Sequence, residues 1–315
     1  MKYRVIWDDC EDNRIGEPFE IEGDSLKDAY HKAEGRIKGL SDYLNAHFCS
    51  IDIECLVDEK GKYHNPDFFL NEENYEPKAK KDKRLVIVSG PSGVGKGPIV
   101  EWMKKMYLPD LCQVKVRKTP TPKHKGTEND LNFNNLSKDT YDFDCRGTKQ
   151  IIDLHELDNA LESHDAVLLE AYYKSFDFLK ARYENSTDFI PTFISPLSKE
   201  EIKELVKQGK TLEDYLLDTM PNSLIERSKR EGKVFTHSLI KELGLRAEDS
   251  ANEMRFAYNY KKIIPNHCPE SDARWALQNL IGEPKRVVDA LYQIIQTGNS
   301  DFADDGSDYN FWGLK

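Results

Sequence analysis

A glycine-rich loop in the first half of the chain has the residue types and spacing of a phosphate-binding site. Residues 89–97 read Ser-Gly-Pro-Ser-Gly-Val-Gly-Lys-Gly, between the apolar run 84–89 and a helix-forming stretch at 98–105. Glycines let backbone N–H groups converge on phosphate oxygens, and the dipole of the following helix attracts the same anion. Strand, loop and helix in this order favour a Walker A motif, whose lysine, here Lys96, acts on the terminal phosphates.

The nucleotide-binding prediction covers most of this loop. The residues predicted to bind the donor phosphates are Gly90, Ser92, Gly93, Val94, Gly95, Lys96 and Gly97. The loop departs from the usual motif after the lysine, because Gly97 and Pro98 supply no hydroxyl for a phosphate or for Mg²⁺. Two alternatives stay open: a glycine turn without a ligand, and a loop that binds nucleotide without catalysing transfer.

Basic residues gather between residues 115 and 146. Arg and Lys side chains hydrogen-bond phosphate oxygens, so this stretch predicts a site for an anionic acceptor. A solvated basic loop is the alternative for each of these residues. The candidates are Arg117, Lys118, Lys123, Lys125 and Arg146.

The wording of the glycine loop resembles that of guanylate kinases, and later segments match the same family in the same order. Residues 144–148 resemble its Tyr-Gly-Thr acceptor segment, with Arg146 in the place of the tyrosine. Residues 165–170 resemble its second core strand, where Glu170 keeps the first acid and Tyr172 replaces the second. The matches stay collinear from residue 84 to about residue 295, roughly two thirds of the chain.

Three further segments extend the resemblance. Residues 189–201 resemble the strand and turn that lead into the family's lid, 246–254 resemble its returning helix, and Asn266 stands where the family has an adenine-side asparagine. The resemblance implies ATP and Mg²⁺ as cofactors. It also implies that Lys96 and Arg246 stabilise the transferring phosphoryl group and that Glu170 orders a magnesium-bound water.

The acceptor half departs from the family most. The resemblance assigns Arg146, Thr148 and Tyr172 to the acceptor pocket, beside the basic residues. The paired arginines that clamp GMP in the family are absent, and residues 134–145 are too few for its guanine-reading helix. The guanine-binding residues are therefore not carried over to this chain, and we expect GMP to be a poor or unselective acceptor.

The predicted lid also differs from that of the family. Its arginine positions hold Lys207 and Lys210 here, and an insertion from residue 211 to about residue 241 adds Arg227 and Arg230. Either pair would stabilise the charge that spreads over a transferring phosphoryl group. For the arginine on the returning helix, a surface ion pair is the alternative.

The elements that hold these residues are expected to form two units. Residues 1–76 are predicted to be a small acidic α/β domain, 77–84 a basic linker, 85–298 the guanylate kinase-like domain, and 299–315 a mobile acidic C-terminal tail. The fold class is α/β: a three-layer P-loop kinase fold with a mainly parallel central sheet, preceded by the small domain.

Composition excludes several classes of function. The 315 residues carry a net charge of -11, which argues against long nucleic acid as a partner. No apolar run reaches the roughly 18 residues of a membrane span, and the start of the chain lacks an apolar signal core. The six cysteines form no Cys-x-x-Cys pair, and the histidines do not pair at metal spacing. We therefore expect reduced thiols and a cytoplasmic location.

The sequence thus predicts an enzyme that transfers a phosphoryl group from ATP to a small phosphate-bearing acceptor, most simply a nucleoside monophosphate. One alternative is a catalytically weak guanylate kinase-like binding module. Another is a kinase for a sugar phosphate, a modified nucleotide or a DNA base. The acidic N-terminal domain is a candidate surface for a protein partner, with a solvated surface as the alternative, and the oligomeric state stays open.

Overall fold

The computed structural model describes most of the chain. The described residues are 1–9, 14–15, 18–44, 51–59, 63–64, 83–118, 136–146, 148–211, 215–216, 224–226, 228–229, 232 and 234–313. Four predicted site residues lie outside them: Lys123, Lys125, Arg227 and Arg230. Most of the predicted linker, residues 77–82, also lies outside them.

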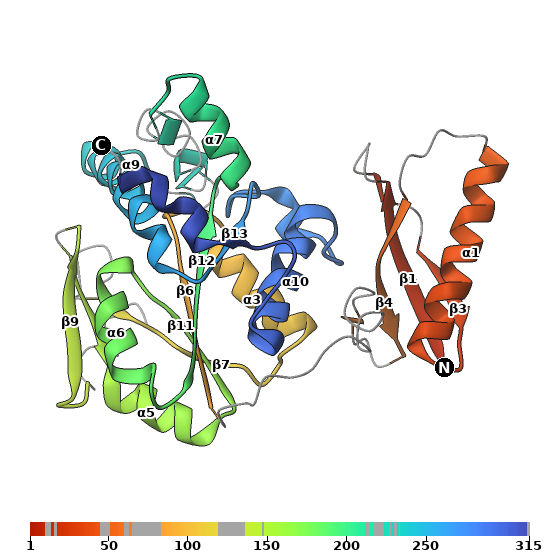
Figure 1. Ribbon diagram of the computed structural model, residues 1–315, viewed down its shortest axis with the longest axis horizontal. Helices are drawn as coiled ribbons and strands as arrows, with labels where there is room; N and C mark the ends of the chain where they lie inside the picture. Colours follow the sequence, from red (N-terminus) through yellow and green to blue (C-terminus); the bar gives the residue numbers. More distant parts are fainter. Residues whose placement is uncertain are drawn as a thin grey trace.

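The N-terminal unit is an antiparallel sheet with a helix on one face (Figure 1). Alternate residues of its first strand, Tyr3 and Val5, pack against Ala29 and Ala33 of the helix, as the two-residue period of a strand requires. The unit therefore has a hydrophobic core of its own. Its elements are β1 (Lys2–Asp9), β2 (Arg14–Ile15), β3 (Phe19–Glu22), α1 (Leu26–Leu44), β4 (Ile51–Asp58) and β5 (Tyr63–His64).

A six-stranded sheet is the centre of the larger unit. Its order is β14-β13-β12-β6-β11-β7, and β14 is the single antiparallel member. The mixed α/β composition and the mostly parallel sheet are compatible with a P-loop kinase fold. The strands are β6 (Arg84–Ser89), β7 (Cys112–Val114), β11 (Ala166–Glu170), β12 (Asp188–Ser195), β13 (Lys262–Pro265) and β14 (Asp304–Asp305).

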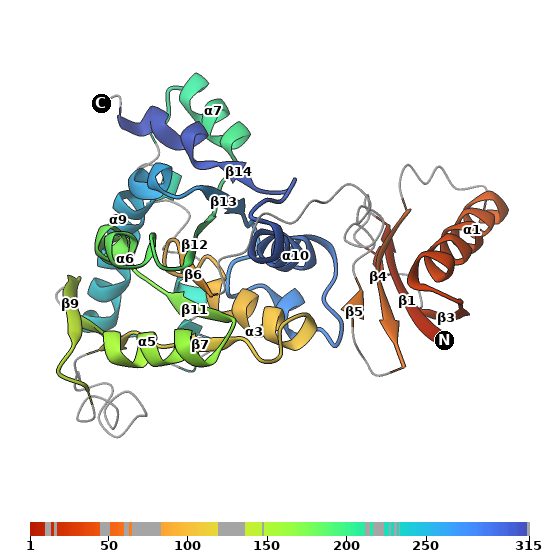
Figure 2. The same ribbon diagram turned by 60° about the horizontal axis from the view of Figure 1, so that its bottom comes forward.

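Helices cover both faces of this sheet, so the larger unit has three layers (Figures 1 and 2). Alternate residues of β6 show the reason: Leu85 and Ile87 pack with α5, α6 and α9, whereas Val86 and Val88 pack with α3 and α10. The helices are α3 (Lys96–Met106), α5 (Leu154–Ser163), α6 (Phe176–Tyr183), α7 (Lys199–Lys207), α9 (His237–Phe256) and α10 (Gly282–Thr297). The 3₁₀ segments are η2 (Tyr173–Ser175), η3 (Ala257–Asn259), η4 (Ala273–Ala276) and η5 (Gly306–Gly313).

A smaller antiparallel sheet lies beside the central one. Its order is β8-β10-β9, where β8 is Arg117–Lys118, β9 is Thr140–Cys145 and β10 is Thr148–Asp153. Strands β9 and β10 are paired from Thr140 and Asp153 to Cys145 and Thr148, and Arg146 lies in a turn directly after β9. This turn belongs to the predicted acceptor segment. We call β9 and β10 the acceptor hairpin.

The C-terminal residues differ from the predicted mobile tail. Strand β14 joins the central sheet, and Tyr309 of η5 is fully buried. The hydroxyl of Tyr309 donates to the carbonyl of Leu197 at 2.9 Å. The prediction is wrong here because the acidic residues, which read as a solvated run, pair with α7: Lys199 lies 3.4 Å from Asp304 and 3.0 Å from Asp308. We call residues 304–309 the C-terminal strap.

Among the described helices, none has both the length and the apolar character that crossing a membrane requires.

Candidate functional site

The glycine loop joins the end of β6 to the first residue of α3. Gly90 has a φ of 142° and Gly95 a φ of 98°, conformations that other residues rarely adopt. A Cβ on Gly90 would lie 2.2 Å from the carbonyl oxygen of Ile194, and a Cβ on Gly95 would lie 2.8 Å from Nδ2 of Asn266. Glycine is therefore required at both positions for the loop to keep this form.

Lys96 begins α3 and returns its ammonium group over the loop. Its Nζ donates to the carbonyl of Gly90 at 2.6 Å and to that of Pro91 at 2.8 Å. These neutral acceptors hold the charge at the N-terminus of α3, where the helix dipole favours an anion. Phosphate oxygens can replace the two carbonyls as partners of the lysine.

Residues 266–275 support the loop from behind. Nδ2 of Asn266 donates to the carbonyls of Val94, at 2.6 Å, and Cys268, at 2.9 Å, and the backbone N–H of Glu270 donates to Gly93. Asn266 is 1% exposed, so its amide is used inside the protein. The asparagine thus positions the phosphate loop, and its place in the lining of an adenine pocket stays a prediction. A polar residue at a strand end suits either role, and the sequence alone does not separate them.

One face of α9 carries three charged residues, Arg246, Asp249 and Glu253. Their spacing of three and four residues places them on the same side of a helix. Nη1 of Arg246 donates to Oγ of Ser92 in the glycine loop at 3.4 Å. The predicted arginine therefore reaches the loop that is expected to hold the donor phosphates.

The two acids of α9 contact the acceptor hairpin and the segment after β11. Nη1 of Arg146 lies 3.5 Å from Oδ2 of Asp249 and 3.9 Å from Oε1 of Glu253. The hydroxyl of Tyr172 donates to the same Oδ2 of Asp249. Helix α9 thus contacts the glycine loop with its arginine and the predicted acceptor residues with its two acids.

Burial changes the acid–base properties of this cluster. It raises the pKa of Glu253 to about 8, although the positive charges of Lys96 and Arg146 oppose the shift. Burial and the hydrogen bond to Asp249 raise the pKa of Tyr172, so the phenol keeps its proton at neutral pH. A buried carboxyl of raised pKa beside the phosphate-loop lysine is typical of a functional site.

Arg146 has a backbone conformation that is uncommon for a residue with a side chain. Its φ is 55°, which the tight turn of the acceptor hairpin imposes. The side chain is 22% exposed, and among the described residues its Nη1 has ion-pair neighbours but no hydrogen bond. Such strain is retained where the surrounding structure or the function requires it. Within the part of the chain that the structure describes, Nη1 is a buried donor that has not used its hydrogen-bonding capacity.

The two residues of β8 take different roles because neighbours on a strand point to opposite faces. Arg117 binds Glu156 of α5. Partial burial and the nearby positive charge of Arg246 lower the pKa of Lys118. The Lys118 side chain is nevertheless exposed to solvent. Acceptor binding by Arg117 stays a prediction, in which the acceptor would compete with Glu156, whereas Lys118 lies in the electrostatic neighbourhood of Arg146 and Arg246.

Glu170 ends β11, next to β6 and the glycine loop. Its charge acts on Lys118 and Glu253, which places all three in one electrostatic neighbourhood. The part of the chain that the structure describes holds no group of three His, Cys, Asp or Glu side chains suited to a metal ion. One carboxylate suffices for Mg²⁺, which keeps several waters and uses phosphate oxygens as ligands.

The remaining predicted residues are only partly brought together. Thr148 begins β10, beside Arg146 in the turn. In the predicted lid, Lys207 is 75% exposed and lies 3.6 Å from Glu204, and Lys210 is also exposed. The described contacts bring neither lysine to the glycine loop.

Sequence reasoning did not assign roles to Asp249, Glu253 and His267. The helical spacing of the first two from Arg246 was a usable signal, because it places them on the face that carries the predicted arginine. Their partner Arg146 lies about a hundred residues away, and the sequence did not indicate that contact.

Comparison with known proteins gives one match of note. The chain is 24% identical over 152 residues to a guanylate kinase of Prochlorococcus marinus subsp. pastoris, which covers 43% of this chain and 77% of that protein. No protein-family model matches the chain. Over the matched range the chain is similar to a guanylate kinase, and this similarity is distant.

Proposed function

We propose that this protein transfers the γ-phosphoryl group of ATP to a small phosphate-bearing acceptor, most simply a nucleoside monophosphate. The observation that carries the proposal is the convergence of three elements on one place. Arg246 contacts Ser92 of the glycine loop, while Asp249 and Glu253 on the same helix contact Arg146. The distant similarity to a guanylate kinase supports the same reaction.

Donor binding follows from the glycine loop. Backbone N–H groups of residues 93–97 and the N-terminus of α3 would bind phosphate oxygens, and Lys96 would exchange its two carbonyl partners for them. Arg246, which contacts Ser92 of the loop, would stabilise the charge that develops on the transferring group. Mg²⁺, when bound, would neutralise charge on the donor phosphates, and Glu170 would hold one of its waters.

Acceptor binding rests on Arg146 and Lys118. Both are cations in the electrostatic neighbourhood of Arg246, and the buried Nη1 of Arg146, which makes no hydrogen bond among the described residues, would donate to an acceptor oxyanion that displaces Asp249. Tyr172 stands where the family resemblance expects an acid, and its hydroxyl donates to Asp249. Because this hydroxyl already donates its proton to Asp249, it cannot also donate to a nucleobase, and we do not expect strong selection of guanine.

A second candidate function is nucleotide binding without transfer. Two observations favour it: Gly97 and Pro98 supply no hydroxyl, and the charge of Arg146 is already paired with Asp249. ATP binding and ATP turnover, measured separately, distinguish the two functions. Binding with no ADP formed in the presence of any acceptor would favour the second.

The experiment that tests the proposal is an acceptor screen. Wild-type protein is incubated with ATP, Mg²⁺ and one acceptor at a time from GMP, AMP, dTMP, other nucleoside monophosphates and sugar phosphates, and ADP is measured. We expect ADP with at least one phosphate-bearing acceptor and no strong preference for GMP. Efficient and exclusive use of GMP would contradict the acceptor assignment.

A further inference from the structure

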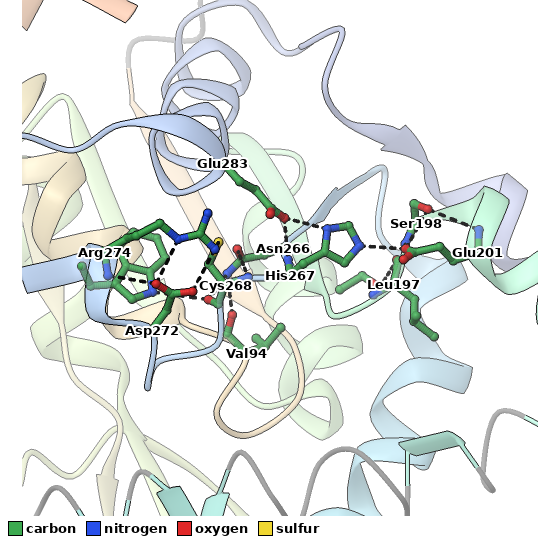
Figure 3. Close-up of polar contacts among 12 residues, drawn as sticks. Val94, Leu197, Ser198, Glu201, Asn266, His267, Cys268, Asp272, Arg274 and Glu283 are labelled. Atoms are coloured by element: carbon green, nitrogen blue, oxygen red, sulfur yellow. Dashed lines mark hydrogen bonds and ion pairs between the residues drawn. The ribbon is translucent and has the colours of Figure 1, made fainter. Parts of the chain in front are cut away.

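His267 joins three parts of the larger unit (Figure 3). It directly follows Asn266, which holds Val94 of the glycine loop. Its Nδ1 lies 2.6 Å from Oε1 of Glu283 in the first turn of α10, and its Nε2 lies 2.8 Å from Oε2 of Glu201 in the first turn of α7. An ionised carboxylate only accepts hydrogen bonds, so both ring nitrogens donate when the imidazole is protonated.

Helix α7, which enters the predicted lid, depends on contacts at its base. Ile202 is its buried residue, whereas Val206 near its end is 55% exposed. Ser198 and Glu201 form a capping box, and the oxygen of Glu201 that accepts from Ser198 also faces His267. Besides Ile202, only the half-buried Leu205 of this helix packs against the described core, so the bonds of the first turn contribute substantially to its orientation.

The C-terminal strap binds the same turn from another direction, through Lys199. The two sets of contacts differ in chemistry. Lysine keeps its charge throughout the neutral and mildly alkaline range, whereas histidine titrates there when carboxylates surround it. His267 is thus the pH-sensitive member of the two anchors at the base of α7.

The charged groups facing His267 are Glu201 on α7 and Glu283 on α10. Their hydrogen bonds, that of Glu283 first, raise the pKa of His267 to about 9. Partial burial opposes a fall in the pKa of either carboxyl. Hydrogen bonds from Ser198 and His267 nevertheless lower the pKa of Glu201, and those from the side chain and backbone of His267 lower the pKa of Glu283. The imidazolium contribution is therefore complete below pH about 6.5 and is lost as the pH rises through about 9.

We propose that His267 is a positioning residue that ties the base of α7 to the wall of the phosphate loop, and that this tie opens when the imidazole loses its proton. The tie goes beyond phosphoryl transfer, because it concerns the stability of α7 itself. Its consequence for lid closure rests on the proposed function, whereas its test does not require activity.

Limited proteolysis under native conditions tests the tie. Trypsin cleaves after Lys203, in the middle of α7, when that helix opens, and mass spectrometry measures the rate. The variant is His267→Gln. The control is His155→Gln on α5, whose ring contacts Asn159 and no carboxylate that the structure describes. The cleavage rate of His267→Gln is divided by that of His155→Gln at each pH, and this ratio cancels the effect of pH on trypsin activity.

We expect His267→Gln to be cleaved about fivefold faster or more than the control at pH 7, since a hydrogen bond to a charged group is lost and its exposure weakens the effect. At pH 9.5 the ratio should fall below about twofold, because the imidazole of His267 is then neutral in most wild-type molecules. A ratio near one at pH 7, or an equal ratio at both pH values, would overturn the proposal.

A second variant keeps the proposal testable if His267→Gln does not fold. Glu201→Gln retains an oxygen for the capping bonds to Ser198 and removes the charge that faces the ring. We expect the same pH-dependent increase over the neighbouring control Glu200→Gln, whose side chain is exposed. The double variant Glu201→Gln, His267→Gln should be cleaved no faster than either single variant, and an additive effect would contradict a shared tie.

Discussion

The two cations near the glycine loop, Lys96 and Arg146, already have partners within the protein. Two backbone carbonyls hold Lys96, and Asp249 and Glu253 hold Arg146. Both cations are thereby positioned before a phosphate enters, and the phosphate then competes with these partners. Positioning of this kind lowers the reorganisation needed during transfer.

Replacement of Arg146 tests the acceptor site. We expect Arg146→Met to raise the KM for the acceptor about tenfold or more, with a much smaller change in the KM for ATP, because a charge-assisted hydrogen bond to the acceptor is lost. Steady-state kinetics with the best acceptor measure both constants. The matched control is Lys149→Met, which removes the same charge from β10, where Lys149 is 53% exposed and pairs with Asp142 at 2.8 Å. A similar rise in both KM values for Arg146→Met would place the arginine outside the acceptor site.

At the scale of elements, the C-terminal strap and α7 depend on each other. The hydroxyl of Tyr309 donates to Leu197 at 2.9 Å and lies 3.0 Å from Oδ2 of Asp304. These contacts fix the turn between β12 and α7. The strap therefore contributes to the position of α7 at the start of the predicted lid, although the two segments lie about a hundred residues apart in the sequence.

Loss of the Tyr309 hydroxyl measures this contribution. Tyr309→Phe should lower the free energy of unfolding by about 1 kcal/mol, since the carbonyl of Leu197 loses one of its two described donors, the other being Oγ of Ser195, while packing is retained. Urea unfolding gives the value. Tyr258→Phe serves as the control because Tyr258 is 46% exposed. Equal stabilities of the two variants would show that the strap is not held by this hydroxyl.

Local patterns in the sequence predicted elements well. The apolar run 84–89 coincides with β6, and the glycine loop leads directly into α3. These features depend on neighbouring residues, so strand composition and glycine spacing are sufficient to find them. The positive φ values of Gly90 and Gly95 agree with the requirement for glycine at both positions.

Contacts between distant residues were not predictable in the same way. The bond between Tyr309 and Leu197 joins residues 112 positions apart, and an acidic run gives no sign of it. Arg117 contacts Glu156 of α5, whereas Lys118 interacts with Arg246. This difference depends on which face of β8 meets α5, and the composition of the segment does not indicate that face. Features that depend on neighbouring residues could therefore be predicted from the sequence, whereas contacts between distant residues could be identified only from the three-dimensional structure.

At the scale of the whole molecule, the chain contains two units with separate cores. The N-terminal core is built from β1, β4 and α1, and the larger unit has its own cores on both faces of the central sheet. A hydrogen bond of 3.3 Å joins Arg4 to Asn279. No residue proposed for the site precedes β6.

Removal of residues 1–76 tests the independence of the larger unit. We expect the shortened chain to fold and to bind ATP with an affinity within about threefold of the full chain, because separate cores fold independently. Circular dichroism and equilibrium ATP binding are the measurements. A folded but non-binding fragment would show that the N-terminal unit contributes to the site.

The most direct test of phosphoryl transfer is ADP formation by wild-type protein and Lys96→Ala, with Mg²⁺, saturating ATP and the best acceptor. The lysine acts on ligand charge, so we expect its loss to lower turnover at least about 100-fold while the circular dichroism spectrum stays unchanged. The control Lys104→Ala, on the same helix, should retain wild-type turnover. Near-normal turnover of Lys96→Ala would contradict the assignment of the glycine loop as the site of transfer.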